Sequence, residues 1–163
     1  MPKPPRSPVP FSMESYHRHQ GEVSLLMSHF FIDYLWDIYR QFDGDLALVI
    51  VLGEIAHHNL ANHFPTRSEA DRETLPNYLG NAEMRARMPA CNAYSLAAAT
   101  GMPRETIRRK IARLVELGWV ERPSRREIRI TDKVSEHFLP DFNVQLLTKL
   151  LITSDRIRGV LTI

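Results

Sequence analysis

Cysteine is almost absent from this chain of 163 residues, and long apolar runs are absent altogether. The single cysteine, Cys91, has no second cysteine in the chain to pair with, so a reducing compartment is expected. The longest strongly apolar stretch, from Leu46 to Leu52, is too short to span a bilayer. The N-terminus also lacks the apolar segment of a secretory signal. We therefore expect a cytoplasmic protein that makes no membrane contact.

Motifs of nucleotide binding and catalysis are missing as well. The sequence contains no glycine-rich phosphate loop, no paired CxxC and no nucleophile elbow. No nucleophile, base and orienting residue form a recognisable set. The paired acids Asp33 and Asp37 fall on a helix face that we expect to be solvated. We predict that the chain is not an enzyme and that it needs no cofactor.

Histidine and cysteine suggest a metal or redox role, but only weakly. His57 and His58 are adjacent and point about 100° apart on a helix, so they cannot easily share one ion. His29 and His63 could add ligands, but no acidic or cysteine ligand is spaced to complete a site. Cys91 could act as a redox switch, although a lone cysteine is more often a small buried residue. We predict neither a metal site nor a redox sensor.

Positive charge is concentrated in one segment, although the net charge is only +2. Residues 1–83 contain six basic and eleven acidic side chains, and residues 134–163 contain three of each. Residues 84–133 contain twelve basic and five acidic side chains. A basic segment between acidic and neutral ones favours a surface that faces a polyanion. A solvated basic face without a partner is the alternative.

The first 43 residues predict an arm followed by a helix. Residues 1–20 contain five prolines, which remove N–H donors and restrict their neighbours, so we expect a flexible arm. Apolar residues then recur at helical spacing, which predicts an N-terminal dimerisation helix over residues 21–43. Its Trp36, Tyr39 and Phe42 are more typical of a core or a dimer interface, with an effector pocket as the alternative.

We expect a DNA-binding domain over residues 44–138. Asp45 is a candidate N-cap for a helix from about Leu46 to His63, which is apolar nearly all round in its first half and should lie in the core. Prolines and a glycine punctuate residues 64–91, which predicts an irregular insertion. A short helix around residues 82–88 is the alternative for part of that insertion.

The most informative segment is residues 93–131. Ser95 can cap a short helix over residues 95–100, and Gly101 permits the sharp turn after it. A second helix over residues 103–117 has arginines on the side opposite an apolar stripe. That stripe contains Ile107, Ile111, Leu114 and Leu117.

A basic hairpin follows this second helix. Residues 119–122 and 128–130 predict two strands, and the residues between them predict a turn. Helix, turn, basic helix and basic hairpin is the order of a winged helix-turn-helix, in which a helix enters the major groove. We therefore expect a mainly α fold with a small β-wing and with extra N-terminal and C-terminal helices.

Residues 93–131 resemble the reading head of bacterial winged helix-turn-helix transcription regulators of the GntR, MarR and IclR type. The closest similarity is to GntR-type heads, in the stretch Arg-Glu-Thr-Ile-Arg at residues 104–108 and in Arg-Leu-Val-Glu-Leu-Gly-Trp at residues 113–119. The resemblance implies that Arg104, Thr106 and Arg108 contact DNA. The resemblance is limited to this DNA-binding module and does not assign the chain to one of these families.

The predicted function is sequence-specific binding of double-stranded DNA by a transcriptional regulator that acts by occupying its operator. The residues expected to read or clamp the major groove are Arg104, Thr106, Arg108 and Arg109. Those expected mostly to hold phosphates are Arg113, Arg125 and Arg126. The full set of candidate DNA contacts is Ser95, Arg104, Glu105, Thr106, Arg108, Arg109, Lys110, Arg113, Arg125 and Arg126. An interaction module of a nucleoprotein assembly is the alternative function.

The C-terminal residues 139–163 predict a helix that is too apolar to stand alone. We expect this helix and the N-terminal helix to form a homodimer interface. A small-molecule effector is an open expectation, because the sequence does not indicate its chemistry.

Overall fold

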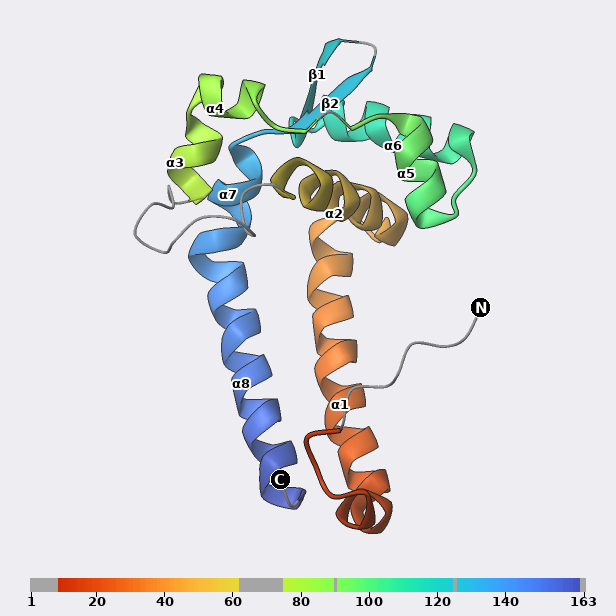
Figure 1. The fold of residues 1–163 in the computed structure, drawn as a ribbon, viewed down its shortest axis with the longest axis vertical. Helices are drawn as coiled ribbons and strands as arrows, with labels where there is room; N and C mark the ends of the chain where they lie inside the picture. Colours follow the sequence, from red (N-terminus) through yellow and green to blue (C-terminus); the bar gives the residue numbers. More distant parts are fainter. Residues whose placement is uncertain (1–8, 62–74, 90, 125, 162–163) are drawn as a thin grey trace. The chain divides into compact units, whose positions relative to one another are not determined.

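The computed structural model describes residues 9–61, 75–89, 91–124 and 126–161, and all structural statements below refer to these residues. The fold is mainly helical with one two-stranded antiparallel sheet, as expected. The elements in chain order are α1 (Met13–Gln41), α2 (Leu46–Leu60), α3 (Leu75–Gly80), α4 (Ala82–Ala86), α5 (Ala93–Thr100), α6 (Arg104–Glu116), β1 (Val120–Ser124), β2 (Glu127–Ile130), α7 (Lys133–His137), the π-helical turn η2 (Phe138–Phe142) and α8 (Asn143–Val160) (Figure 1).

The chain divides into two compact units. The first combines Met1–Asp37 with Asn143–Ile163 and therefore contains most of α1 and all of α8. The second is Ile38–Phe142, which contains α2 to α7, the sheet and η2. The predicted reading head lies wholly within the second unit.

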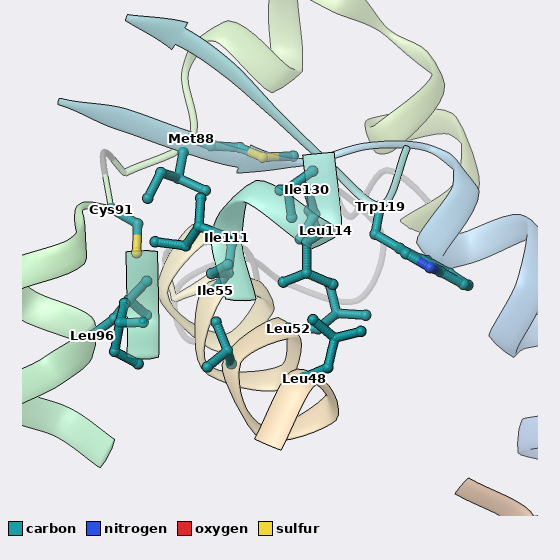
Figure 2. Close-up of a cluster of buried hydrophobic side chains, with 14 of the residues drawn as sticks. Leu48, Leu52, Ile55, Met88, Cys91, Leu96, Ile111, Leu114, Trp119 and Ile130 are labelled. Carbon is teal, nitrogen blue, oxygen red and sulfur yellow. The ribbon is translucent and has the colours of Figure 1, made fainter. Parts of the chain in front are cut away.

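The second unit is built around α2. In the view of Figure 1, α2 lies directly below α6 and the hairpin. Figure 2 shows Leu48, Leu52 and Ile55 of α2 facing side chains of α5, α6 and the sheet. Burying these side chains supplies the main stabilisation, at about 1.5–3 kcal/mol for each large apolar group. The buried cluster also includes Leu96, Ile107, Ile111, Leu114, Trp119, Val120, Ile128 and Ile130.

The two strands of the hairpin pair with each other, and β2 also pairs with the segment before α5. Val120 pairs with Ile130 across the two strands. On the other side of β2, Cys91 forms an isolated antiparallel bridge with Ile128, whose N–H donates to the Cys91 carbonyl at 3.0 Å. The segment before α5 therefore adds a third, one-residue strand position to the sheet.

The structure contains the predicted turn at Gly101 and the predicted helix cap at Asp45. Gly101 ends α5 with φ +70°, a left-handed conformation that side-chain-bearing residues rarely adopt. Its N–H donates to the Ala97 carbonyl, which closes the helix before α6 begins at Arg104. Asp45 caps α2 as expected, because its side chain accepts from the Leu48 N–H at 3.0 Å.

Two predicted helix starts are wrong. α1 begins at Met13, so residues 13–20 are helical and do not belong to the expected arm. The last proline of that segment is Pro10, and Glu14 lies in the first turn, where a negative charge favours the helix dipole. The C-terminal α-helix begins at Asn143 and not at residue 139, because residues 138–142 form the π-helical turn η2.

The expected insertion is partly helical. α3 and α4 occupy residues 75–80 and 82–86, so the alternative of a short helix near residues 82–88 is confirmed. Asn81 caps α4 by accepting from the N–H groups of Glu83 and Met84. Residues 64–74 and 90 of the predicted insertion lie outside the described residues.

The first unit exposes much of its apolar surface. Among its described residues, the buried large apolar side chains are Val23 and Leu161. An ion pair also links its two helices, because the Lys149 ammonium of α8 lies 2.7 Å from the Asp37 carboxylate of α1. The exposed apolar side chains include Leu25, Met27, Phe31, Ile32, Leu35 and Trp36 on α1 and Val144, Leu147, Leu150, Leu151 and Ile152 on α8.

Candidate nucleic-acid interface

One side of α6 is buried and the other is strongly basic. Ile107, Ile111 and Leu114 are buried against the core, which confirms the predicted apolar stripe. Leu117, the fourth expected member, follows the helix and is half-buried. The exposed side chains on the rest of α6 are Arg104, Glu105, Arg108, Arg109, Ala112, Arg113, Val115 and Glu116.

The exposed arginines are only weakly engaged by neighbouring acids. Arg108 lies 3.7 Å from the Glu105 carboxylate, and Arg113 lies 3.1 Å from that of Glu116. Exposed pairs of this kind contribute roughly 0–1 kcal/mol, so a phosphate or a base edge can replace the acid at little cost. The structure therefore leaves these guanidinium groups accessible to a polyanion.

Lys110 is separated from this exposed basic face. Its ammonium lies 2.5 Å from the Asp45 carboxylate at the start of α2, and its side chain is only 15% exposed. Partial burial by itself would raise the pKa of Asp45. Hydrogen bonds from Lys110 and the Leu48 N–H, together with the charges of Lys110 and Arg109, lower the pKa on balance. Lys110 thus holds α6 against α2, a contact that its position in a basic run did not indicate.

The start of α5 differs from the prediction for Ser95. The N-cap is Asn92, whose side chain accepts from the N–H groups of Tyr94 and Ser95. Ser95 is the third helical residue, and its hydroxyl accepts in return from the Asn92 N–H. This reciprocal capping box starts the helix two residues before residue 95 and engages the Ser95 hydroxyl.

Tyr94 joins the basic face from α5, and sequence reasoning missed it. The Arg104 guanidinium carbon lies 4.6 Å from the centre of the Tyr94 ring. The tyrosine is 65% exposed, so this cation–π contact sits at the surface. An exposed aromatic residue at the start of the first helix of the motif is the signal that could have found it.

Of the two arginines expected to contact DNA from the hairpin turn, one is described. Arg126 is exposed, and its N–H donates to the Ser124 hydroxyl at the turn. Arg125 lies outside the described residues. Arg129 is mostly buried and pairs with Glu127 at 3.3 Å, so it belongs to the packing of the hairpin. Thr106 on α6 is half-buried beside the exposed arginines.

Asn59 fixes the hairpin on α2 and was also missed. This side chain is 1% exposed and makes three hydrogen bonds. Its amide nitrogen donates to the Pro89 and Ile128 carbonyls at 3.1 and 3.2 Å, and its oxygen accepts from the Ile130 N–H at 2.9 Å. An asparagine between the apolar positions Ile55 and Leu60 of a core helix is the signal that could have identified it.

The remaining candidates are the cysteine considered for redox chemistry, the histidines considered for metal binding and the aromatic residues considered for an effector pocket. Cys91 is fully buried, and burial raises the pKa of its thiol to about 11, against smaller lowering effects of Ser95 and Asn92. His57 and His58 are exposed, and no three potential ligands cluster among the described residues; His63 lies outside them. Phe42 packs in the core, whereas Trp36 and Tyr39 are about half exposed.

None of the helices in the described part of the chain combines the length and apolar character that a membrane span requires. Comparison of the chain with protein-family models, with curated proteins and with solved structures found no match.

Proposed function

We propose that the protein is a cytoplasmic, sequence-specific DNA-binding regulator whose reading head is a winged helix-turn-helix. The observation that carries this proposal is the exposed face of α6, where Arg104, Arg108, Arg109 and Arg113 surround the side opposite the buried stripe. An α-helix fits the major groove, and arginine is the commonest side chain to read guanine there.

The order of the elements supports the same proposal. α2, the strand position at Cys91, α5, α6 and the β1–β2 hairpin follow one another as in a winged helix. The sharp turn at Gly101 joins α5 to α6, and the hairpin carries the exposed Arg126 at its turn. In this arrangement α6 reads bases, and the hairpin holds phosphates.

Two substitutions separate base reading from phosphate contact. Arg108→Ala should relax sequence preference, with a loss of about 1–3 kcal/mol at one cognate base pair. Arg126→Ala should weaken binding to all duplexes alike and reduce the salt slope by about one unit. Arg156→Ala, which removes an exposed arginine of α8, is the matched control.

The measurement is fluorescence anisotropy with duplexes selected from a random library, repeated across salt concentrations. If the Arg108 and Arg126 variants both bind as the parent does, the proposed reading head is wrong. Absence of any salt-sensitive binding to duplex DNA would instead favour the protein-interaction module.

We propose further that two copies associate through the first unit. Leu25, Ile32 and Trp36 are exposed and lie within about 40° of one another around α1. Val144, Leu147 and Leu151 form a similar exposed stripe on α8. A two-helix unit with so few buried apolar side chains is too small to be stable alone, and a second copy would bury these stripes.

Charge also favours a second copy as the partner. α1 contains four acidic and two basic residues, whereas α8 contains three basic and one acidic residue. Packing α1 of one copy beside α8 of the other therefore brings opposite charges together. Such a dimer should prefer half-sites about 34 Å apart or a multiple of that spacing. A monomeric mass by light scattering at micromolar concentration would contradict it.

A further inference from the structure

A cavity of about 370 Å³ lies between α1 and α8. All its lining residues belong to the first unit, so its walls are defined within that unit. Its volume falls in the range of small-molecule sites. The walls are mostly apolar and come from Met27, Phe30, Phe31, Leu150, Ile157 and Leu161.

Three of the side chains that line this cavity are polar, and all three come from α8. They are Thr153, Ser154 and Arg158. Ser154 and Arg158 are four residues apart, so they share one face of the helix. Within the described residues, neither hydroxyl makes a hydrogen bond and the Arg158 guanidinium has no acidic partner.

An apolar cavity lined by one guanidinium that has no acidic partner in the described part of the chain suits an amphipathic anion. The guanidinium can donate two parallel hydrogen bonds to a carboxylate, and the Ser154 hydroxyl, one turn away, can donate to the same oxygens. One positive charge matches one negative charge, which favours a carboxylate over a phosphate dianion. At about 30 Å³ for each water-sized atom, the cavity holds roughly a dozen non-hydrogen atoms.

We propose that this cavity binds a monocarboxylate with an apolar tail of about ten carbons, with the carboxylate on Arg158 and Ser154. The tail lies among Met27, Phe31 and Ile157. This binding site is independent of DNA binding, because every residue that lines it is outside the candidate nucleic-acid interface.

The cavity and the proposed dimer stripe use different sides of α1. Phe30 and Met27 lie about 140° and 160° around the helix from Leu25, at 100° for each residue. A second copy on the stripe of Leu25 and Ile32 therefore leaves these α1 walls of the cavity in place. On α8, Ser154 and Arg158 continue the face of Leu147 and Leu151 beyond the end of the dimer stripe. An apolar helix seated in the cavity would instead desolvate Arg158 without a counter-ion, at a large cost.

Isothermal titration calorimetry of the full chain, without DNA, tests the site. The probes are decanoate and the uncharged decanamide, which has the same tail. We expect decanoate to bind at least tenfold more tightly than decanamide, because a hydrogen bond to a charged group adds about that factor. Arg158→Gln should abolish this preference and leave decanamide binding unchanged within about twofold.

Two further variants complete the experiment. Arg156→Gln removes a neighbouring arginine that does not line the cavity, and it should bind decanoate as the parent does. Leu150→Trp fills the cavity and should weaken both probes. Equal binding of the two probes, an unchanged decanoate affinity in Arg158→Gln, or no binding of decanoate at 1 mM would each overturn the proposal. None of these results bears on DNA binding, which has its own assay.

Discussion

Replacing Asn59 by alanine tests whether one buried amide holds the hairpin on α2. The side chain bonds to three backbone groups that come from two separate segments, the stretch before Cys91 and β2. Alanine removes all three hydrogen bonds. The Ile128 carbonyl and the Ile130 N–H remain in a buried environment, where an unsatisfied group costs about 1–3 kcal/mol.

The expected loss is therefore about 3 kcal/mol of the free energy of unfolding, at about 1 kcal/mol for each hydrogen bond. Asn59→Asp sharpens the test because it conserves the shape of the side chain. The aspartate oxygen can still accept from the Ile130 N–H, but its second oxygen faces the carbonyls of Pro89 and Ile128. A role in packing alone would tolerate aspartate, whereas a role as donor predicts a loss at least as large as that of alanine.

Urea unfolding followed by tryptophan fluorescence measures these losses. Trp119 is buried in the same core as Asn59, so it reports on the second unit. All proteins should carry Trp36→Phe, because Trp36 is exposed in the other unit and would add a second signal. His57→Ala is the matched control on α2 and should change stability by less than about 0.5 kcal/mol. A loss below about 1 kcal/mol for Asn59→Ala would refute the reasoning.

Two further predictions concern titratable groups. Asp45→Asn should lower the free energy of unfolding by about 1 kcal/mol at pH 7, since asparagine can still cap α2 but cannot pair with Lys110. The folded pKa of Asp45 is lowered, so this contribution is present above the ordinary value of 3.8 and is lost as the pH falls through the folded value. Urea titrations at pH 7, 5 and 3 should show the difference shrinking at pH 3, and a constant difference would contradict the ion pair. Cys91 should react with a disulfide reagent only on unfolding, because a pKa of about 11 leaves roughly one thiolate in ten thousand at pH 7. Complete labelling of the native protein within minutes would show that the thiol is accessible and ionised.

Periodicity predicted the parts of this fold that a single helix or strand decides. The stripe of Ile107, Ile111 and Leu114 is buried as expected because a helix can bury only one side against a neighbour. The turn at Gly101 was also predictable, because few other residues adopt its positive φ. These features depend on local sequence, which is why they could be inferred without the structure.

Two of the errors concern residues far apart in sequence, and one concerns a choice between neighbouring caps. Lys110 appeared to belong to a basic run, but Asp45, 65 residues earlier, engages its ammonium. Ser95 appeared to be a cap because the reciprocal partner, Asn92, is an equally good one. Asn59 gave only a weak local signal, since its three partners lie 30 to 71 residues away along the chain.

The two long-range contacts of α2 together determine how the candidate DNA contacts are presented. Asp45 at one end holds α6 through Lys110, and Asn59 near the other end holds β2. With a rise of 1.5 Å for each residue, these two anchors are about 21 Å apart along the helix. A helix of this length is stiff, so it fixes the spacing between the arginines of α6 and Arg126 before any ligand binds. Fixing that spacing in advance reduces the entropy lost on binding. If the proposed DNA-binding function is correct, loss of either anchor should therefore weaken DNA binding even at temperatures where the variant remains folded.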